Sequence, residues 1–107
     1  MSVEINVTGE VVTAYLSGEL DHHTAKSMRE TIDSAVELNM PSLLILDFSN
    51  INFMDSSGIG LVMGRYRLLS SKNKKLVVEN LSERDYKIMK MSGIEKLAVI
   101  SQKGEKI

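Results

Sequence analysis

The stretch that decides the fold runs from Leu43 to Gly60 and reads LLILDFSNINFMDSSGIG. It opens on an apolar run, Leu43 to Leu46, which is typical of a central β-strand covered on both faces, and we expect Asp47 to close that strand. After a connection from Asn50 to Asp55, an acid, two hydroxyls and two glycines predict a helix that begins near Ser57. A buried strand followed directly by a helix is the building unit of α/β folds.

On both sides of this stretch, the sequence shows further patterns typical of strands and helices. Towards the N-terminus, β-rich runs at 3–7 and 11–16 surround Gly9 and predict a hairpin. Apolar residues then recur at helical spacing from Ala25 to Val36, and Asp21 or Thr24 would cap that helix. Towards the C-terminus we predict, in order, a helix over 57–69, a strand over 76–78, a helix over 83–91 and a strand over 97–100.

This order of elements predicts an α/β fold, with a mixed, mostly parallel β-sheet opened by an N-terminal hairpin and covered by α-helices. A chain of 107 residues is long enough for one core, so we expect a single domain over 1–107. Sites in such sheets gather where strands hand over to helices. Two loops, Gly18 to Thr24 and Phe53 to Gly60, are therefore expected to carry the function.

Composition excludes several classes of protein. The net charge of -1 provides no overall field to attract nucleic acid or an anionic membrane. The absence of Cys removes disulfides, zinc-thiolate sites and thiol catalysis, and fits a reducing cytoplasm. The apolar runs are far shorter than the ~20 residues of a membrane span, and no signal peptide is recognisable. We expect a cytoplasmic protein without direct nucleic-acid or membrane binding.

The segment Phe53 to Gly60 is the densest chemical signal. A helix start presents free amides and partial positive charge, so a Ser there could accept a phosphoryl group. The alternative is that Ser56 or Ser57 is simply the N-cap. The spacing does not fit a phosphate-binding loop, a dinucleotide fingerprint or a nucleophile elbow. Gly60 and Gly64, four residues apart, predict a helix that lies close against the sheet.

The segment Asp21-His22-His23 is the second constellation. Adjacent histidines diverge on a helix, and no Cys supports them, so we expect no metal site. A polar loop that faces solvent or a partner is the better interpretation. A Ser-His-Asp hydrolase would need an orienting acid and an oxyanion hole that cannot be placed, and we expect no catalytic residues.

Four segments together resemble the anti-sigma factor antagonists of the sulfate-transporter and anti-sigma-factor-antagonist (STAS) fold, and most of all the sporulation-type antagonist. The resemblance runs from the first predicted strand to the last. One departure is the C-terminus, because family members often carry a further helix and Ser101 to Ile107 is too short and polar for one. The matching segments are Gly18 to Ala25, Phe53 to Gly60, Gly64 to Tyr66 and Met91 to Gly93.

The resemblance implies a partner switch. The unphosphorylated antagonist binds an anti-sigma factor that is also a serine kinase and so frees a sigma factor. The kinase then phosphorylates the first Ser of the motif, here Ser56, and a PP2C-type serine phosphatase resets the protein. No cofactor is implied. The resemblance further implies a set of partner-binding residues: Asp21, His22, His23, Thr24, Asp55, Ser57, Gly58 and Ile59.

A second function remains open at this point. The same helix start could serve a small-molecule or nucleotide-binding domain of STAS-like fold that has no kinase partner. The two functions differ in what the isolated chain would do, because only the second predicts ligand binding without a protein partner.

Overall fold

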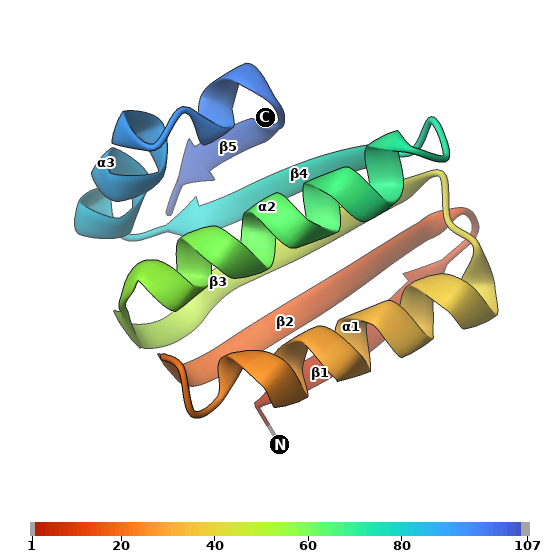
Figure 1. Cartoon of the computed structure of the whole chain (residues 1–107), viewed down its shortest axis with the longest axis horizontal. Coiled ribbons are helices and arrows are strands. Elements are labelled where there is room, and N and C mark those ends of the chain that lie inside the picture. The colour runs from red at the N-terminus through yellow and green to blue at the C-terminus, as the bar shows by residue number, and fades with distance from the viewer. Residues whose placement is uncertain (1, 106–107) are drawn as a thin grey trace.

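The computed structural model describes residues 2–105 of the chain. Figure 1 shows the arrangement of the elements. In chain order they are β1 (Val3–Thr8), β2 (Val11–Leu20), α1 (Ala25–Asn39), β3 (Leu43–Met54), α2 (Ser56–Ser70), β4 (Lys75–Leu81), α3 (Glu83–Met91), the short 3₁₀ helix η1 (Ile94–Lys96) and β5 (Val99–Gln102).

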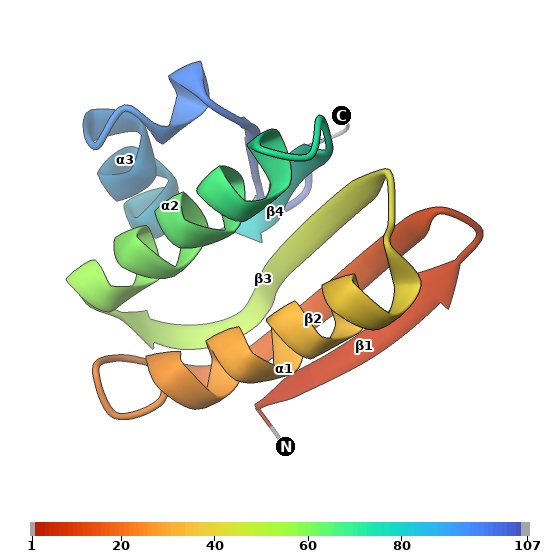
Figure 2. The ribbon, with the colours of Figure 1, turned by 45° about the vertical axis from the view of Figure 1, so that its right-hand side comes forward.

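Within residues 2–105 the strands form one five-stranded sheet in the order β1-β2-β3-β4-β5. The β1–β2 pair is antiparallel and turns at Gly9, whereas β2, β3, β4 and β5 pair in parallel. The predicted mixed sheet with an N-terminal hairpin is therefore confirmed. Helices α1 and α2 run side by side across one face of this sheet (Figures 1 and 2). None of the helices in this described part is long and apolar enough to cross a membrane.

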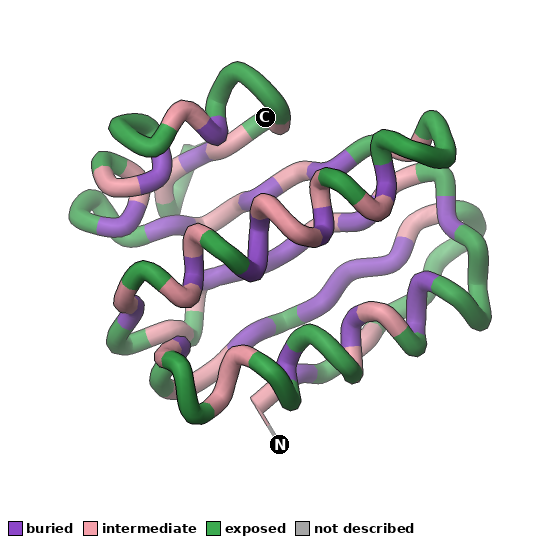
Figure 3. The backbone as a smooth tube through the Cα atoms, in the orientation of Figure 1, coloured by how far each residue is buried: buried purple, intermediate pink, exposed green. Residues whose placement is uncertain are grey.

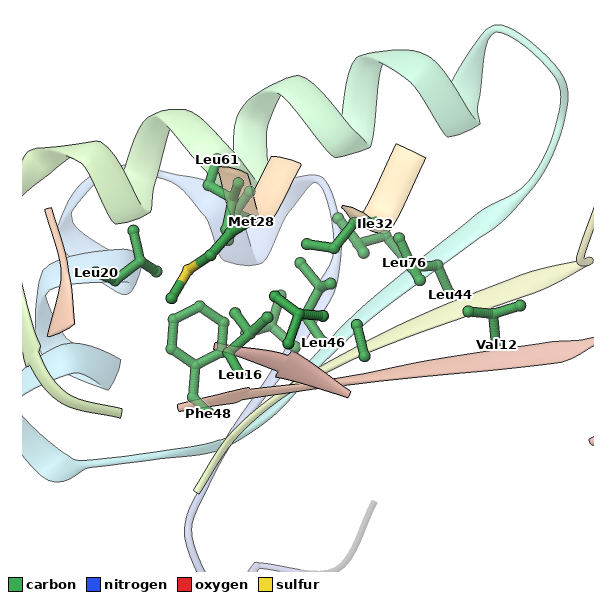
Figure 4. Packing of buried hydrophobic residues seen from close by; sticks show 14 of the residues in the cluster. Val12, Leu16, Leu20, Met28, Ile32, Leu44, Leu46, Phe48, Leu61 and Leu76 are labelled. Carbon is green, nitrogen blue, oxygen red and sulfur yellow. The ribbon is translucent and has the colours of Figure 1, made fainter. Parts of the chain in front are cut away.

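The core lies between these helices and the sheet. Met28 and Ile32 of α1 and Leu61 of α2 point towards Leu16 and Leu46 of the strands (Figure 4). Buried residues run along β3 and recur along α2 (Figure 3). Burying such side chains stabilises the fold by roughly 1.5–3 kcal/mol each, so the sheet and the two helices form one rigid support.

The prediction that the Leu43–Leu46 run is covered on both faces is wrong. Leu44 and Leu46 are fully buried, but Leu43 and Ile45 are only half-buried. Successive strand residues point to opposite faces, and within residues 2–105 helices α1 and α2 cover the face of Leu44 and Leu46. The sheet is therefore covered on one side.

The prediction that Asp47 closes this strand is also wrong. Strand β3 continues to Met54, although its pairing with β4 ends at Asp47. Beyond that point β3 stays paired with β2 through register shifts, as far as Leu20 opposite Met54. The polar residues Ser49, Asn50 and Asn52 hide this extension in the sequence. Because of this extension, the residues that follow Met54 lie at the same edge of the sheet as the end of β2.

The start of the last strand and the position of the close-packed glycine also differ from the sequence prediction. The last strand begins at Val99 rather than Leu97, because η1 occupies the preceding residues. The close-packed glycine is Gly58, where an added Cβ would collide with the side chain of Met54. At Gly60 and Gly64 an added Cβ would meet no atom within 4 Å, so their predicted role in close packing is wrong.

Candidate functional site

The two loops singled out in the sequence lie next to each other. Leu20 at the end of β2 pairs with Met54 at the end of β3. The amide of Asp55 donates a hydrogen bond of 3.2 Å to the carbonyl oxygen of Leu20. Parallel pairing thus places Asp21 and Asp55 at the same edge of the sheet, each at the point where a helix begins.

The start of α1 is closed by internal hydrogen bonds. Asp21 Oδ1 accepts from the amides of His23 (2.8 Å) and Thr24 (3.2 Å). The Thr24 hydroxyl donates to the Glu19 carbonyl (2.7 Å) and accepts from the Asp21 amide (3.1 Å). Burial raises the pKa of Asp21, but the two amide hydrogen bonds outweigh it and lower the pKa below its ordinary value. Thr24 occupies the N-cap position, yet Asp21 supplies the carboxylate that receives the free amides.

His22 and His23 project from this closed loop into solvent. Both are exposed, and their ring centroids lie 3.9 Å apart with the planes tilted by 38°. His23 Nδ1 lies 3.7 Å from Asp21 Oδ1. Within residues 2–105, no group of three or more His, Asp or Glu side chains is placed to hold a metal ion. Both rings are accessible at the surface of this loop.

The start of α2 is organised differently. Asp55 is the N-cap, and its Oδ1 accepts from the Ser57 amide at 2.8 Å. The alternative that Ser56 or Ser57 is the N-cap is therefore wrong. Ser56 is the first helical residue and is exposed, and its hydroxyl makes no hydrogen bond with any other residue of 2–105. Ser57 is half-buried. Of the two hydroxyls, that of Ser56 is the more accessible.

Packing beneath the α2 start fixes its position. Gly58 is buried against the side chain of Met54, and Ile59 is half-buried against the core. Phe53 remains 47% exposed, although it directly precedes the buried Met54. Our interpretation of the sequence left Phe53 out of the contact set. Successive strand residues face opposite sides, so a strand predicted as far as Met54 would have shown that Phe53 points away from the core.

A cationic side chain from a third element also reaches this edge. Arg84, near the start of α3, donates from Nη1 to the Met54 carbonyl oxygen (3.3 Å) and to Asp85 Oδ1 (3.1 Å). Its side chain is 64% exposed. Arg84 lies 30 residues from Met54 in the sequence, and no motif connects the two. Only the parallel order of β3 and β4 brings them together.

Helices α1 and α2 are joined behind their starts by an ion pair. Arg65 Nε lies 2.9 Å from Asp33 Oδ1, with the Arg65 side chain 8% exposed and that of Asp33 29% exposed. The N–H does not point along this line, so the contact is an ion pair without an aligned hydrogen bond. Burial raises the pKa of Asp33, and the Arg65 guanidinium partly offsets that effect.

Comparison with known proteins places this geometry in a family. The model of the STAS domain family matches residues 2–106. An anti-sigma F factor antagonist of Paenibacillus polymyxa is 34% identical over 100 residues, which cover 94% of this chain and 86% of the relative. The solved structure of the anti-sigma factor antagonist SpoIIAA in its unphosphorylated form is 34% identical with a TM-score of 0.78, and the match covers 92% of this chain and 86% of that one.

A second solved structure shows a relative in a modified state. The Bacillus cell fate determinant SpoIIAA in its phosphorylated form is 34% identical with a TM-score of 0.73, over 92% of this chain and 89% of that one. Since the family model spans nearly the whole chain and these relatives share a third of its residues in the same order, the chain belongs to the STAS domain family and, within it, to the anti-sigma factor antagonists.

Proposed function

We propose that this chain is a partner switch that acts by binding rather than by catalysis. Its unphosphorylated form binds an anti-sigma factor that is also a serine kinase, and so releases a sigma factor. Phosphorylation of Ser56 by that kinase switches the chain off. The observation that carries the proposal is the exposed Ser56 hydroxyl at the start of α2, which has no hydrogen bond within residues 2–105 and lies beside the loop that holds Asp21.

The physical basis of the switch is local charge. A phosphate adds about -1.5 to -2 charges at pH 7. The partial positive charge of a helix start tolerates such a group, so the domain need not unfold. Asp21 and Asp55 lie at the same edge, and a partner surface that complements these two carboxylates has no compensation for a third anionic group. Charge and bulk thus enter the middle of the interface.

In this proposal the partner contacts the starts of α1 and α2 together. Asp21, His22, His23 and Thr24 supply the α1 side, and Asp55, Ser57, Gly58 and Ile59 supply the α2 side. The exposed histidines support a direct role in contact. Gly58 is buried, so it supports binding by letting the start of α2 pack against Met54, and it offers no exposed surface to the partner.

The rest of the cycle follows from the same proposal. A PP2C-type serine phosphatase removes the phosphate and restores binding. Residues 1–107 act as one domain in the cytoplasm, without direct contact to nucleic acid or membrane. The near-neutral net charge supports this, because no large background field masks the charge added at Ser56.

The decisive experiment is incubation with the anti-sigma factor kinase and ATP, followed by site-resolved mass spectrometry. We expect one phosphate on Ser56. The matched control Ser57→Ala keeps this modification, whereas Ser56→Ala loses it. Phosphate found on Ser57 in the unaltered chain would overturn the assignment.

Binding measurements test the switch itself. Ser56→Ala should bind the anti-sigma factor in a calorimeter but resist release by ATP. Ser56→Asp should bind roughly a hundredfold more weakly, which corresponds to a loss of about 3 kcal/mol. Equal affinities for Ser56→Asp and Ser56→Ala would show that charge at this position does not control binding.

The groove beside the C-terminal half of α2 does not favour the small-molecule alternative. A groove lined by residues that include Tyr66, Ser70 and Lys74 lies against the C-terminal half of α2. Ser70 is the last residue of α2 and Ser56 the first, so they lie about 20 Å apart along the helix. This groove therefore does not open onto the start of α2.

A further inference from the structure

We propose that Arg84 becomes a direct partner of the phosphate on Ser56. In the phosphorylated chain its guanidinium would move from the Met54 carbonyl to the phosphate oxygens and form an ion pair between the starts of α3 and α2. This inference rests on the proposed function, because it requires phosphorylated Ser56. It adds a residue outside the contact set that the sequence indicates.

The position of Arg84 puts it within reach. Its Nη1 already donates to the Met54 carbonyl oxygen at 3.3 Å. Met54 stands two residues before Ser56, and two peptide units separate their Cα atoms by at most about 8 Å. A phosphoryl group extends the serine side chain further. In the proposal, rotation of the Arg84 side chain carries the guanidinium from the Met54 carbonyl oxygen to the phosphate.

The contact of Arg84 with Met54 is weak enough to be exchanged. The bond to Met54 is long and its acceptor is a neutral carbonyl. The side chain is 64% exposed, so it is free to rotate in solvent. Phosphate offers several charged acceptors in the geometry that a guanidinium binds with two parallel hydrogen bonds. Asp85 Oδ1, at 3.1 Å, can keep one of the donors while others turn to the phosphate.

The local charge balance favours the exchange. Asp21 and Asp55 both lie at this edge, so a phosphate there would be repelled from two sides. Arg84 is a permanent cation joined to the strand end by a hydrogen bond, whereas His22 and His23 carry charge only when protonated. An Arg84–phosphate pair would offset part of that repulsion and hold the phosphate against the chain.

The chain supplies a matched control in Lys87. It lies one turn further along α3, carries the same charge and is 67% exposed, but its ammonium pairs with Glu83 at 3.4 Å. If any positive charge on α3 suffices, Lys87→Ala and Arg84→Ala should behave alike. If the proposal is correct, only Arg84→Ala should change the second pKa of the phosphoserine.

The experiment uses the full chain with phosphoserine installed at position 56 during translation, titrated by phosphorus NMR. We expect the second pKa of the phosphoserine to be about 0.5 lower in the unaltered chain and in Lys87→Ala than in Arg84→Ala. Equal phosphate titrations in the unaltered chain and Arg84→Ala would overturn the proposal.

Thermal unfolding provides the second measurement. Phosphorylation should lower the melting temperature more in Arg84→Ala than in Lys87→Ala, and the unphosphorylated variants show whether the fold itself has changed. Arg84→Gln, which keeps a donor for Met54 without the charge, replaces Arg84→Ala if the latter unfolds. Because the phosphoserine is installed directly, a kinase that ignores Ser56 contradicts the proposed function and leaves this result standing.

Discussion

The starts of α1 and α2 lie side by side at one edge of the sheet, and at each an aspartate side chain accepts a backbone hydrogen bond, but they differ in whether the neighbouring hydroxyl is hydrogen-bonded. At α1 the Thr24 hydroxyl is bonded to Glu19 and to the Asp21 amide. At α2 the Asp55 carboxylate receives an amide, and the Ser56 hydroxyl makes no hydrogen bond within residues 2–105.

This difference separates a helix start whose hydroxyl is held by hydrogen bonds from one whose hydroxyl is open to modification. A hydroxyl committed to two internal hydrogen bonds cannot be modified without breaking them, which would leave polar groups unpaired. An exposed, unbonded hydroxyl can receive a phosphoryl group without the loss of an internal hydrogen bond. In the proposed switch, the loop before α1 therefore provides a constant surface, and the start of α2 provides the position at which charge changes.

The largest expected effect concerns the ion pair that holds the two helices together. Asp33→Ala leaves the buried Arg65 guanidinium without its partner. We expect the free energy of unfolding to fall by about 3 kcal/mol, because an uncompensated buried charge is costly. Urea unfolding followed by circular dichroism measures this loss.

The control for that loss is the double variant Asp33→Ala with Arg65→Met. Removing both charges should restore most of the stability, since the unpaired cation is gone and Met fills part of its volume. If the double variant is as unstable as Asp33→Ala, the loss comes from packing rather than from charge. If Asp33→Ala itself is neutral, the pair does not hold α1 and α2 together.

A smaller effect is expected within α2. Gly58→Ala introduces a Cβ that collides with the Met54 side chain, and such overpacking should cost about 2 kcal/mol. Gly60→Ala, where nothing lies within 4 Å, should instead stabilise by about 0.5–1 kcal/mol through helix propensity. Thermal unfolding of both variants measures whether each substitution lowers or raises the stability. Equal effects would mean that Met54 moves aside and that the α2 start is adjustable.

Sequence reasoning singled out the two loops because sites in parallel sheets gather where a strand is followed by a helix. Hydrophobic periodicity does not reveal which strands are neighbours, so the meeting of the loops follows from the pairing of β2 with β3 in the structure. Sequence reasoning missed the extension of β3 to Met54, since Ser49 to Asn52 interrupt the apolar pattern while register shifts maintain the pairing. It also missed Arg84. The contact of this residue with Met54 arises from tertiary packing between segments 30 residues apart, which leaves no local pattern to detect.

The third prediction compares the two hydroxyls directly. Thr24→Val keeps the shape of the side chain but leaves the Glu19 carbonyl and the Asp21 amide unpaired. It should destabilise the fold by about 1 kcal/mol. Ser56→Ala, at an exposed position without a bond, should change stability by less than about 0.5 kcal/mol. A Ser56→Ala variant as unstable as Thr24→Val would remove the contrast between the two helix starts.

The smallest effect is the pH dependence of the α1 start. Hydrogen bonds from His23 and Thr24 lower the pKa of Asp21 below its ordinary value, despite the opposing effect of burial. A carboxylate with a lowered folded-state pKa stabilises the fold above its ordinary pKa, and this stabilisation disappears as the pH falls through the folded-state value. Asp21→Asn keeps an oxygen that can accept from the same amides, but it does not titrate.

The stability of the unaltered chain should therefore exceed that of Asp21→Asn at neutral pH. The gap in stability should narrow as the pH falls from about 5 through the lowered folded-state pKa of Asp21, where the unaltered carboxylate also becomes protonated. Denaturant unfolding of both chains at several pH values, with NMR titration of the Asp21 carboxyl, measures this. A gap that stays constant or widens on acidification would show that the loop before α1 is not held by the charge of Asp21. The conformation of this loop would then depend on the hydrogen bonds of Thr24 alone.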